Sequence, residues 1–378
     1  MNARHEARTM QQRSGVTPLR VMGSKISYYT GKFEGYLRYK EIPYEFVTMT
    51  PRVRREVTRR TGAAQMPAVE LADGRWMTDT SPMIQWLDSQ FPEPAVIPVD
   101  PEQRFFSLLV EDYAEEWLWR PAMHFRWSYR RDALQLSRTI ADEIVELPIP
   151  GFVKRAGVRR RQIGGWTKGD GVTADTRDHV EGCYTGALER LSAIFANRPF
   201  LLGERPTIAD FGFFASMFRH FGQDPTPAHI MRETAPLVWE WHARLWAARG
   251  SSTHGPLVEG VPDDWNPILD DIGSAYLPYL NANTRAWTRR AERHDAIIEG
   301  VHYRDLPVSQ YRVWCLERLR EHFETLPSDV QDSVRARLEA HGCWKPLWEV
   351  AEPASGYDGD AVPFRGEKVH YPGHRLYG

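Results

Sequence analysis

The chain has 378 residues, 48 Lys and Arg against 50 Asp and Glu, and a formal net charge of -2. With 42% hydrophobic and 26% charged residues, the composition is that of a globular protein and excludes a collagen-like or wholly disordered chain. The near-neutral charge gives no indication of a nucleic-acid partner. No run of about 18 apolar residues occurs, so the sequence predicts no membrane-spanning segment. The length predicts two or three domains.

Residues 1–17 are polar and lack the apolar stretch of a secretion signal, so they are predicted to form a flexible arm. The three cysteines, Cys183, Cys315 and Cys343, are few and far apart. This usage is typical of a reducing compartment and does not suggest a disulfide framework or a thiolate metal cluster. The sequence also lacks a His-Glu-x-x-His motif. We therefore expect a cytoplasmic protein that binds no metal.

Residues 18–98 are predicted to form an α/β domain. Apolar runs and turn signals indicate the following elements in chain order: a strand at 19–23, a helix over 30–40, a strand at 44–49, a strand near 66–71, a return strand from Trp76 and a helix from Ser81. Asp73-Gly74 between the last two strands is a strong hairpin signal. The first two strands are expected to be parallel and the closing hairpin antiparallel.

Residues 99–250 are predicted to be all helical. The periodic stretches run over 102–129, 175–195 and 208–220. Thr207 can cap the last of these helices, and Asp210 can reach back to the amide of the cap. We interpret this pair as a folding element and not as a ligand site.

Residues 251–378 follow the flexible Gly250-Ser251-Ser252 stretch and form a C-terminal extension. Its sequence predicts helices over 267–293, 309–323 and 328–341, with a short β-prone segment at 297–303. The tail from Glu352 is rich in Gly, Pro and charge and is expected to run along the surface. The extension is therefore predicted to be mostly helical.

Three stretches, in this order, carry a family resemblance. They are Ile26-Ser27-Tyr28-Tyr29-Thr30 with Lys40-Glu41-Ile42-Pro43; Gln65-Met66-Pro67 with the segment from Asp79 to Leu87; and Phe200-Leu201-Leu202-Gly203 with Thr207 to Phe211. Over residues 18–250 the chain resembles a bacterial-type cytosolic glutathione transferase (glutathione S-transferase). The resemblance implies a thioredoxin-like domain, an all-helical domain, glutathione as co-substrate, a role in detoxification and a homodimer. The extension departs from the usual family member and can cover the dimer surface, enlarge it or form a lid over the site.

Ser27 is the candidate catalytic residue, because it follows the first strand and precedes the first helix. A hydroxyl there can donate to the sulfur of glutathione, and the helix dipole adds to the stabilisation of a thiolate. The alternative is a helix cap without a catalytic role. Tyr28, Tyr29 and Thr30 are rival donors. Residues 18–98 contain no cysteine, which argues against a thioredoxin, a glutaredoxin or a cysteine-type transferase.

The resemblance also implies the residues that hold the tripeptide. Met66-Pro67 matches the cis-proline element of the family, whose backbone pairs with the cysteinyl part of glutathione. Gln65 suits the glycyl end. Asp79 suits the ammonium of the γ-glutamyl group, and Thr80 at a helix N-terminus suits its carboxylate. Asp-Thr replaces the commoner Glu-Ser, and the same residues also make a good helix start.

A hydrophobic or aromatic electrophile is expected to bind beside Tyr28. Tyr113, Trp117, Arg120 and His124 follow one another at helical spacings of four, three and four, which predicts one shared face. The alternative is a stripe of core or dimer contacts.

A basic connector is predicted to be a solvated loop, with an anion site as the alternative; it contains Lys154, Arg155, Arg159, Arg160, Arg161 and Lys168.

The sequence therefore predicts a glutathione transferase-like enzyme, which adds the glutathione thiolate to an electrophilic molecule or displaces a leaving group from it. A specialised glutathione-dependent dehalogenase, ether-cleaving enzyme or isomerase is one alternative. A non-catalytic binding or scaffold protein on the same fold is another. Nucleic-acid binding through Arg159, Arg160 and Arg161 is the least favoured hypothesis.

Overall fold

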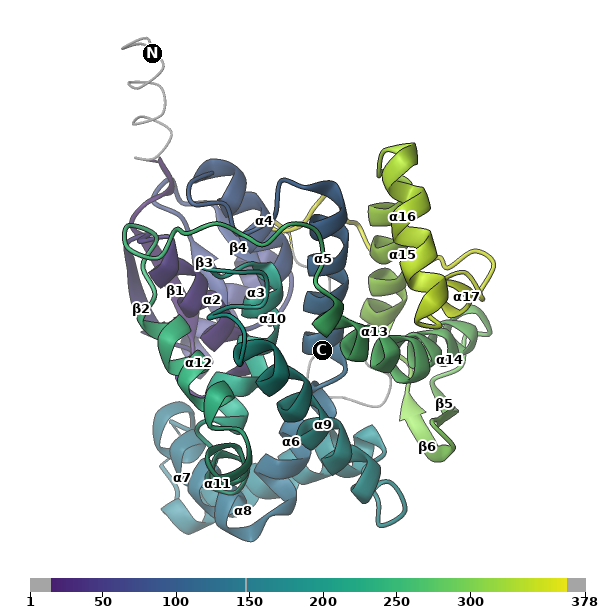
Figure 1. The fold of residues 1–378 in the computed structure, drawn as a ribbon. Helices are drawn as coiled ribbons and strands as arrows, with labels where there is room; N and C mark the ends of the chain where they lie inside the picture. The colour runs from purple at the N-terminus through teal and green to yellow at the C-terminus, as the bar shows by residue number, and fades with distance from the viewer. Residues whose placement is uncertain (1–14, 147, 366–378) are drawn as a thin grey trace.

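The computed structural model describes residues 15–146 and 148–365 (Figure 1). Its N-terminal part is a four-stranded sheet in the order β2-β1-β3-β4. β1 pairs in parallel with β2, with Val21 opposite Phe46, and antiparallel with β3, with Val21 opposite Val69. The strands are β1 (Leu19–Gly23), β2 (Tyr44–Thr48), β3 (Ala68–Glu70) and β4 (Trp76–Thr78). The predicted βαβ unit and the hairpin at Asp73-Gly74 are confirmed.

Three helices complete this domain, namely α2 (Tyr28–Tyr39), α3 (Pro51–Thr61) and α4 (Thr80–Gln90). Ser27 caps α2, and Gly62 ends α3 in the left-handed conformation that glycine adopts without strain. Residues 1–14 of the predicted N-terminal arm lie outside the described residues. Of the arm's last residues, Val16 is buried, and the carbonyls of Gly15 and Val16 accept hydrogen bonds from the turn at Asp73 and Ala72.

The second part is all helical, as predicted. Its helices are α5 (Pro101–Glu116), α6 (Trp119–Ser128), α7 (Arg130–Ile144), α8 (Gly151–Gln162), η1 (Ile163–Thr167), η2 (Lys168–Asp170), α9 (Arg177–Phe195), α10 (Ile208–Ser216), η3 (Met217–Phe221), α11 (Pro225–Thr234) and α12 (Pro236–Ala247). The predicted capping element is confirmed, since the Asp210 side chain accepts from the Thr207 amide at 2.9 Å. It also accepts from the amide of Leu201 and from the Trp241 indole.

Two local predictions in this part were wrong. The single helix expected over 102–129 is broken between α5 and α6 at Trp117 and Leu118. Pro121 lacks the N–H that a continuous helix would donate to the carbonyl of Trp117, so the chain bends there. The basic connector is not a loop: its residues from Lys154 to Arg161 lie on α8, whose only buried residue is Val158, and Lys168 begins η2. Arg159 and Lys154 anchor it to the preceding segment through Ser137 Oγ and the Val145 carbonyl.

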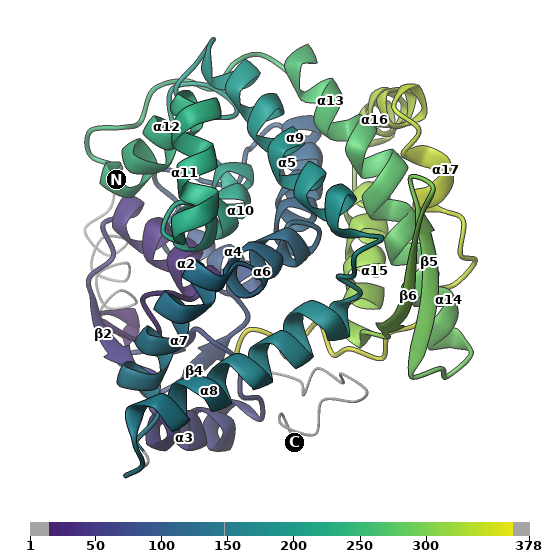
Figure 2. The same cartoon turned by 90° about the horizontal axis from the view of Figure 1, so that it is seen from below.

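The extension packs along one side of the helical part, with α13 beside α9 and the β5–β6 hairpin at the outer edge (Figure 2). Its elements are η4 (Asp263–Trp265), α13 (Asn266–Asp271), η5 (Ile272–Tyr276), α14 (Leu277–Thr288), β5 (Arg293–Ile298), β6 (Val301–Pro307), α15 (Gln310–Glu324), α16 (Ser328–Ala340) and α17 (Trp344–Leu347). It is mostly helical, as predicted. The expected β-prone segment proves to be part of a longer hairpin that turns at Glu299 and Gly300, both with positive φ.

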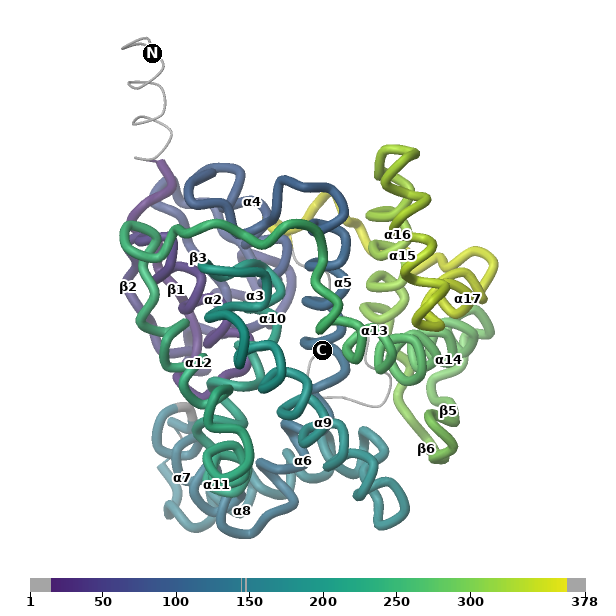
Figure 3. The backbone as a smooth tube through the Cα atoms, in the orientation of Figure 1, coloured from purple at the N-terminus to yellow at the C-terminus, as the bar shows by residue number. Residues whose placement is uncertain are grey.

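The described end of the chain returns to the N-terminal domain, beside α4 (Figure 3). The amide of Thr78 on β4 donates to the carbonyl of Pro363 at 2.9 Å. The ring of Phe364 meets that of Trp86 edge-on. This segment therefore covers the outer edge of the sheet, whereas residues 366–378 of the predicted surface tail lie outside the described residues.

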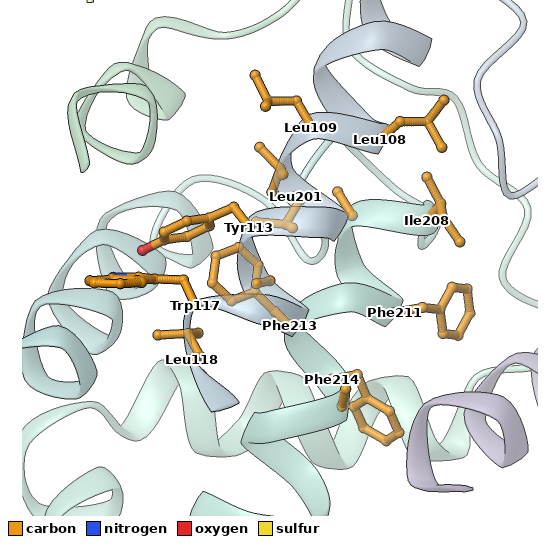
Figure 4. Packing of buried hydrophobic residues seen from close by; sticks show 14 of the residues in the cluster. Leu108, Leu109, Tyr113, Trp117, Leu118, Leu201, Ile208, Phe211, Phe213 and Phe214 are labelled. Atoms are coloured by element: carbon orange, nitrogen blue, oxygen red, sulfur yellow. The ribbon is translucent and has the colours of Figure 1, made fainter. Parts of the chain in front are cut away.

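A continuous hydrophobic core joins the three parts. Figure 4 shows a part of it, where Tyr113 of α5 and Trp117, directly after α5, lie near Phe213 of α10. Core residues from the extension include Tyr276, Leu280 and Leu316. The extension is therefore packed as part of the same body and not as an appended tail.

Close packing of α5 and α10 depends on Gly212. A Cβ at this position would lie 2.7 Å from the Cα of Glu111, which is backbone and cannot move aside. We expect Gly212→Ala to lower the free energy of unfolding by about 1–3 kcal/mol, measured by urea denaturation. Gly182→Ala is the control, because Gly182 lies on the exposed face of α9 and an added Cβ would meet nothing within 4 Å; it should stabilise by about 0.5–1 kcal/mol. Equal effects of the two substitutions would contradict the packing argument.

Candidate functional site

A cavity of about 420 Å³ lies where the N-terminal domain, the helical part and the extension meet. The N-terminal domain contributes the segment after β1, the segment before β3 and the start of α4. The helical part contributes residues of α6, α7, α8 and η1, and the extension contributes Pro307, Tyr311 and Arg312. All three parts of the chain are therefore needed to form it.

The six residues proposed for glutathione all line this cavity: Ser27, Gln65, Met66, Pro67, Asp79 and Thr80. The Met66–Pro67 peptide is cis, as expected. The sequence places these residues in three separate segments, and the β1–β3–β4 pairing brings the segments together. Their common position is consistent with a single extended ligand, although it does not by itself identify one.

Ser27 lies at the N-terminus of α2, where its Oγ accepts a long hydrogen bond from the Thr30 amide (3.4 Å). Because this contact uses the hydroxyl as an acceptor, its O–H can donate to a ligand. Tyr28 is different: its hydroxyl donates to the carbonyl of Ala114 at 2.8 Å. Burial, and then the charge of Glu115, raises the pKa of Tyr28 well above its ordinary value. The Tyr29 hydroxyl donates to Glu116 Oε1 at 3.3 Å.

Gln65 is held by its neighbour on β4. The hydroxyl of Thr78 donates to Gln65 Oε1 at 2.8 Å. With its oxygen fixed in this way, the amide NH₂ of Gln65 is the group that can donate to a carboxylate in the cavity. This geometry suits the role predicted for Gln65 at the glycyl end.

Asp79 has an unusual backbone conformation and an incompletely satisfied carboxylate. Its φ is 73°, which a residue other than glycine rarely adopts. Oδ1 accepts from the hydroxyl of Tyr311 at 3.3 Å, while Oδ2 is buried without a hydrogen-bond partner among the described residues. Burial raises the pKa of Asp79 to about 7, and Lys32 opposes that rise. A cationic group of a ligand would satisfy this carboxylate.

A buried charge network lies behind the start of α4. Lys32 Nζ is fully buried and lies 2.5 Å from Glu111 Oε1 and 2.7 Å from Glu115 Oε1. Ser81 joins the network, because its hydroxyl donates to Glu111 and accepts from Lys32. Burial raises the pKa of Glu115 to about 8, and Lys32 lowers it in part. The network fixes α2, α4 and α5 relative to one another beneath Asp79.

The opposite side of the cavity is aromatic. Tyr29 stacks on Trp119 with ring centroids 5.9 Å apart, and Trp166 meets Trp119 edge-on at 5.5 Å. Met123 and Ile140 also line this side. Such a wall binds a flat apolar group by burial and ring contacts.

Of the residues predicted for the electrophile, only Tyr28 lines the cavity. Tyr113 and Trp117 pack in the core against Phe213 and Tyr279, as Figure 4 shows for Tyr113. The break between α5 and α6 ends the shared helical face on which that prediction depended.

The other two predicted residues form internal contacts. Arg120 donates to the carbonyl of Asp170 at 2.8 Å and lies over the rings of Trp117, Tyr279 and Tyr303. His124 is fully buried and lies 2.8 Å from Glu181. Tyr113, Trp117, Arg120 and His124 therefore occupy the core rather than the cavity wall, which was the alternative interpretation of their spacing.

The sequence analysis missed several lining residues. Ser24, directly after β1, could have been found from its position beside Ser27. Trp119 begins α6 and Trp166 lies on η1, and no spacing in the sequence connects either residue to the site. Tyr311 lies in the extension, more than 200 residues from Asp79, and only the tertiary structure brings it to the cavity.

Within residues 15–146 and 148–365, no helix is long and apolar enough to cross a bilayer. Nor do the described His, Cys, Asp and Glu side chains include a group of three or more that could hold a metal ion.

Comparisons with known proteins identify the class. Residues 21–95 match the family model of the glutathione S-transferase N-terminal domain, and residues 174–244 match that of the C-terminal domain. The chain belongs to the glutathione S-transferase superfamily. No curated protein sequence gives a significant match. The extension lies beyond both matched segments.

Solved structures with similarity include a Tau class glutathione S-transferase from mango, Mangifera indica (14% identity, 63% of this chain and 93% of that chain, TM-score 0.40). A β-etherase from Sphingobium sp. strain SYK-6 shares 18% identity over 60% of this chain and 94% of that chain, with a TM-score of 0.43. A glutathione S-transferase from Methylobacterium radiotolerans, in complex with glutathione sulfonate, shares 19% identity over 65% and 98%, with a TM-score of 0.38.

Proposed function

We propose that this protein is a glutathione transferase-like enzyme that uses the thiolate of glutathione to attack an electrophilic carbon of a hydrophobic or aromatic molecule. The observation that carries the proposal is the meeting of Ser27, Met66, Pro67 and Asp79 in one cavity that Trp119 and Trp166 also line. Membership of the superfamily supports glutathione as the co-substrate.

In the proposed reaction, Ser27 donates a hydrogen bond to the sulfur and the N-terminus of α2 stabilises its negative charge. Gln65, Met66, Asp79 and Thr80 hold the peptide. The thiolate forms a C–S bond, and a leaving group departs with the electron pair of the bond that breaks. Where no group leaves, the electron pair moves onto the electrophile, which then takes a proton from water.

We place the electrophile against Tyr29, Trp119 and Trp166 and keep Tyr28 as part of the cavity floor. Trp166→Ala is expected to raise KM for an aromatic electrophile such as 1-chloro-2,4-dinitrobenzene by about 5- to 30-fold, because the lost ring contact is worth about 1–2 kcal/mol. The affinity for glutathione should stay within twofold. Steady-state kinetics with each substrate varied in turn would measure both, and a change confined to glutathione would contradict this placement.

Calorimetric titration with reduced glutathione tests the proposal as a whole. Saturable binding in the millimolar range or tighter supports it, and Asp79→Asn and Ser27→Ala serve as site variants. Absence of binding by the folded wild-type protein would overturn it and favour the non-catalytic binding or scaffold protein.

Several finer points belong to the same proposal. Product analysis after an electrophile screen distinguishes the general transferase from a specialised dehalogenase, ether-cleaving enzyme or isomerase. A role in detoxification and a homodimer are proposed from the resemblance alone, and a cytoplasmic location is proposed from the few, widely spaced cysteines. Light scattering of the purified full chain tests the homodimer, and association of the protein with nucleic acid is not expected.

A further inference from the structure

The wall of the cavity beside Asp79 comes from the extension. Pro307 ends β6, and Tyr311 and Arg312 lie in the first turn of α15. The matched family domains end at residues 95 and 244. These three side chains are therefore an addition to the cavity that the two domains do not supply.

Tyr311 is fixed where it meets Asp79. Its ring packs against Trp314 at 5.3 Å and against Tyr357 at 6.0 Å between centroids. Tyr311 also lines a second cavity of about 240 Å³, as does Glu116, so both residues lie between the two cavities. The hydroxyl points to Asp79 Oδ1 at 3.3 Å, a long contact of the kind that tightens when a ligand binds.

We propose that Tyr311 is a positioning residue through which the extension orients the Asp79 carboxylate toward the α-ammonium of glutathione. This inference rests on the proposed function. By donating to Oδ1, the hydroxyl holds the carboxylate in its strained setting and leaves Oδ2, which has no hydrogen-bond partner within residues 15–146 and 148–365, to accept from the ammonium. The extension then contributes directly to the affinity of the site.

The charges around Asp79 decide how this contact responds to pH. Lys32 of α2 and the hydrogen bond from Tyr311 of α15 favour the ionised form of Asp79 and lower its pKa. Glu116 and Glu111 of α5 disfavour the ionised form and raise the pKa. Because burial has raised the pKa of Asp79 to about 7, a large share of the protein carries a neutral Asp79 near neutral pH. Loss of the Tyr311 hydroxyl should raise this pKa further.

The test compares glutathione affinity by calorimetry from pH 6 to 8.5 in wild type and Tyr311→Phe. We expect Tyr311→Phe to bind glutathione about 3- to 10-fold more weakly than wild type at pH 7. At pH 8.5, where Asp79 is ionised in both proteins, the difference should be less than about twofold. The pH midpoint of the affinity should therefore move upward. A merely structural role would weaken binding equally at every pH.

Two controls sharpen the test. Tyr279→Phe removes another buried hydroxyl of the extension, one without a hydrogen-bond partner among the described residues, and should leave the pH profile unchanged. Glutaryl-cysteinylglycine, which lacks the α-ammonium, should bind wild type and Tyr311→Phe equally. Equal pH midpoints for glutathione in wild type and Tyr311→Phe would overturn the role of Tyr311 while leaving the proposed function intact. A wild type that binds no glutathione would overturn both.

Discussion

Ser27→Ala is expected to lower kcat for the transfer of glutathione to an electrophile about 10- to 100-fold at neutral pH. It should also raise the pKa of the bound glutathione thiol by about one unit. The substitution removes the hydroxyl nearest the start of α2, and a hydrogen bond to a charged acceptor contributes about 1.5–3 kcal/mol. One pKa unit corresponds to about 1.4 kcal/mol. The dipole of α2 remains, so the thiolate should form less readily but not be abolished.

The absorbance of the bound thiolate, titrated with pH, measures this effect apart from the chemical step. Tyr29→Phe is the matched control, because its hydroxyl already donates to Glu116 and its ring can stay in the wall. An unchanged thiol pKa in Ser27→Ala, with a raised pKa in Tyr29→Phe, would transfer the role to Tyr29. Tyr28 is a poor rival, since its hydroxyl is committed to the Ala114 carbonyl.

Lys32→Met is expected to reduce the free energy of unfolding by about 3–5 kcal/mol at pH 7.5, because it removes the buried ammonium that contacts Glu111 and Glu115 and leaves a buried charge network without its cation. Lys32 Nζ lies within 2.7 Å of a carboxyl oxygen of each glutamate, and all three side chains are almost completely shielded from water. Chemical denaturation of both proteins measures the loss. A difference below about 1 kcal/mol would show that the network contributes little.

The pH dependence of this loss follows from the direction of the Glu115 shift. Its folded pKa of about 8 exceeds the ordinary value of 4.5, so the native state binds the proton more tightly than the unfolded chain. The stability linked to Glu115 is therefore fully present below about pH 4.5 and is lost as pH rises toward 8. Without Lys32 the pKa should rise further, and the deficit of Lys32→Met should shrink at pH 5.

Arg335→Ala is the control for an ion pair without burial. Arg335 and Glu339 meet at 2.8 Å on the exposed face of α16, with side chains 55% and 48% exposed. Such a pair contributes about 0–1 kcal/mol. We therefore expect a small change at every pH, in contrast to the variant of the buried network.

The local parts of the fold were predictable from sequence because short-range rules govern them. The hairpin at Asp73-Gly74, the cap formed by Thr207 with Asp210 and the helix start at Ser27 each depend on residues within a few positions of one another. The prediction failed at Trp117 and Leu118, where the chain leaves α5 and begins α6 instead of continuing as one helix. It also failed for α8, a helix in a segment whose glycines and arginines predict a loop.

The candidate site also has a part that short motifs predicted and a part that they did not. Ser27, Gln65, Met66, Pro67, Asp79 and Thr80 were predicted from motifs in short segments, and all six line one cavity. The aromatic lining by Trp119 and Trp166 was not predicted, because the spacing of Tyr113, Trp117, Arg120 and His124 identified a buried face of the helical core. Periodicity marks which face of a helix is covered, but it does not say whether protein or ligand covers it.

By itself, the sequence determined the class of protein and the succession of an α/β part, a helical part and further helices, and it predicted the residues proposed to bind the peptide. Only the tertiary structure decided that Trp119 and Trp166 form the opposite wall and that Tyr311 reaches Asp79. The physical reason is range. Turns, caps and the parallel β1–β2 unit are specified by neighbours in the chain, whereas a contact across 232 positions depends on how α5 and α15 pack in the common core.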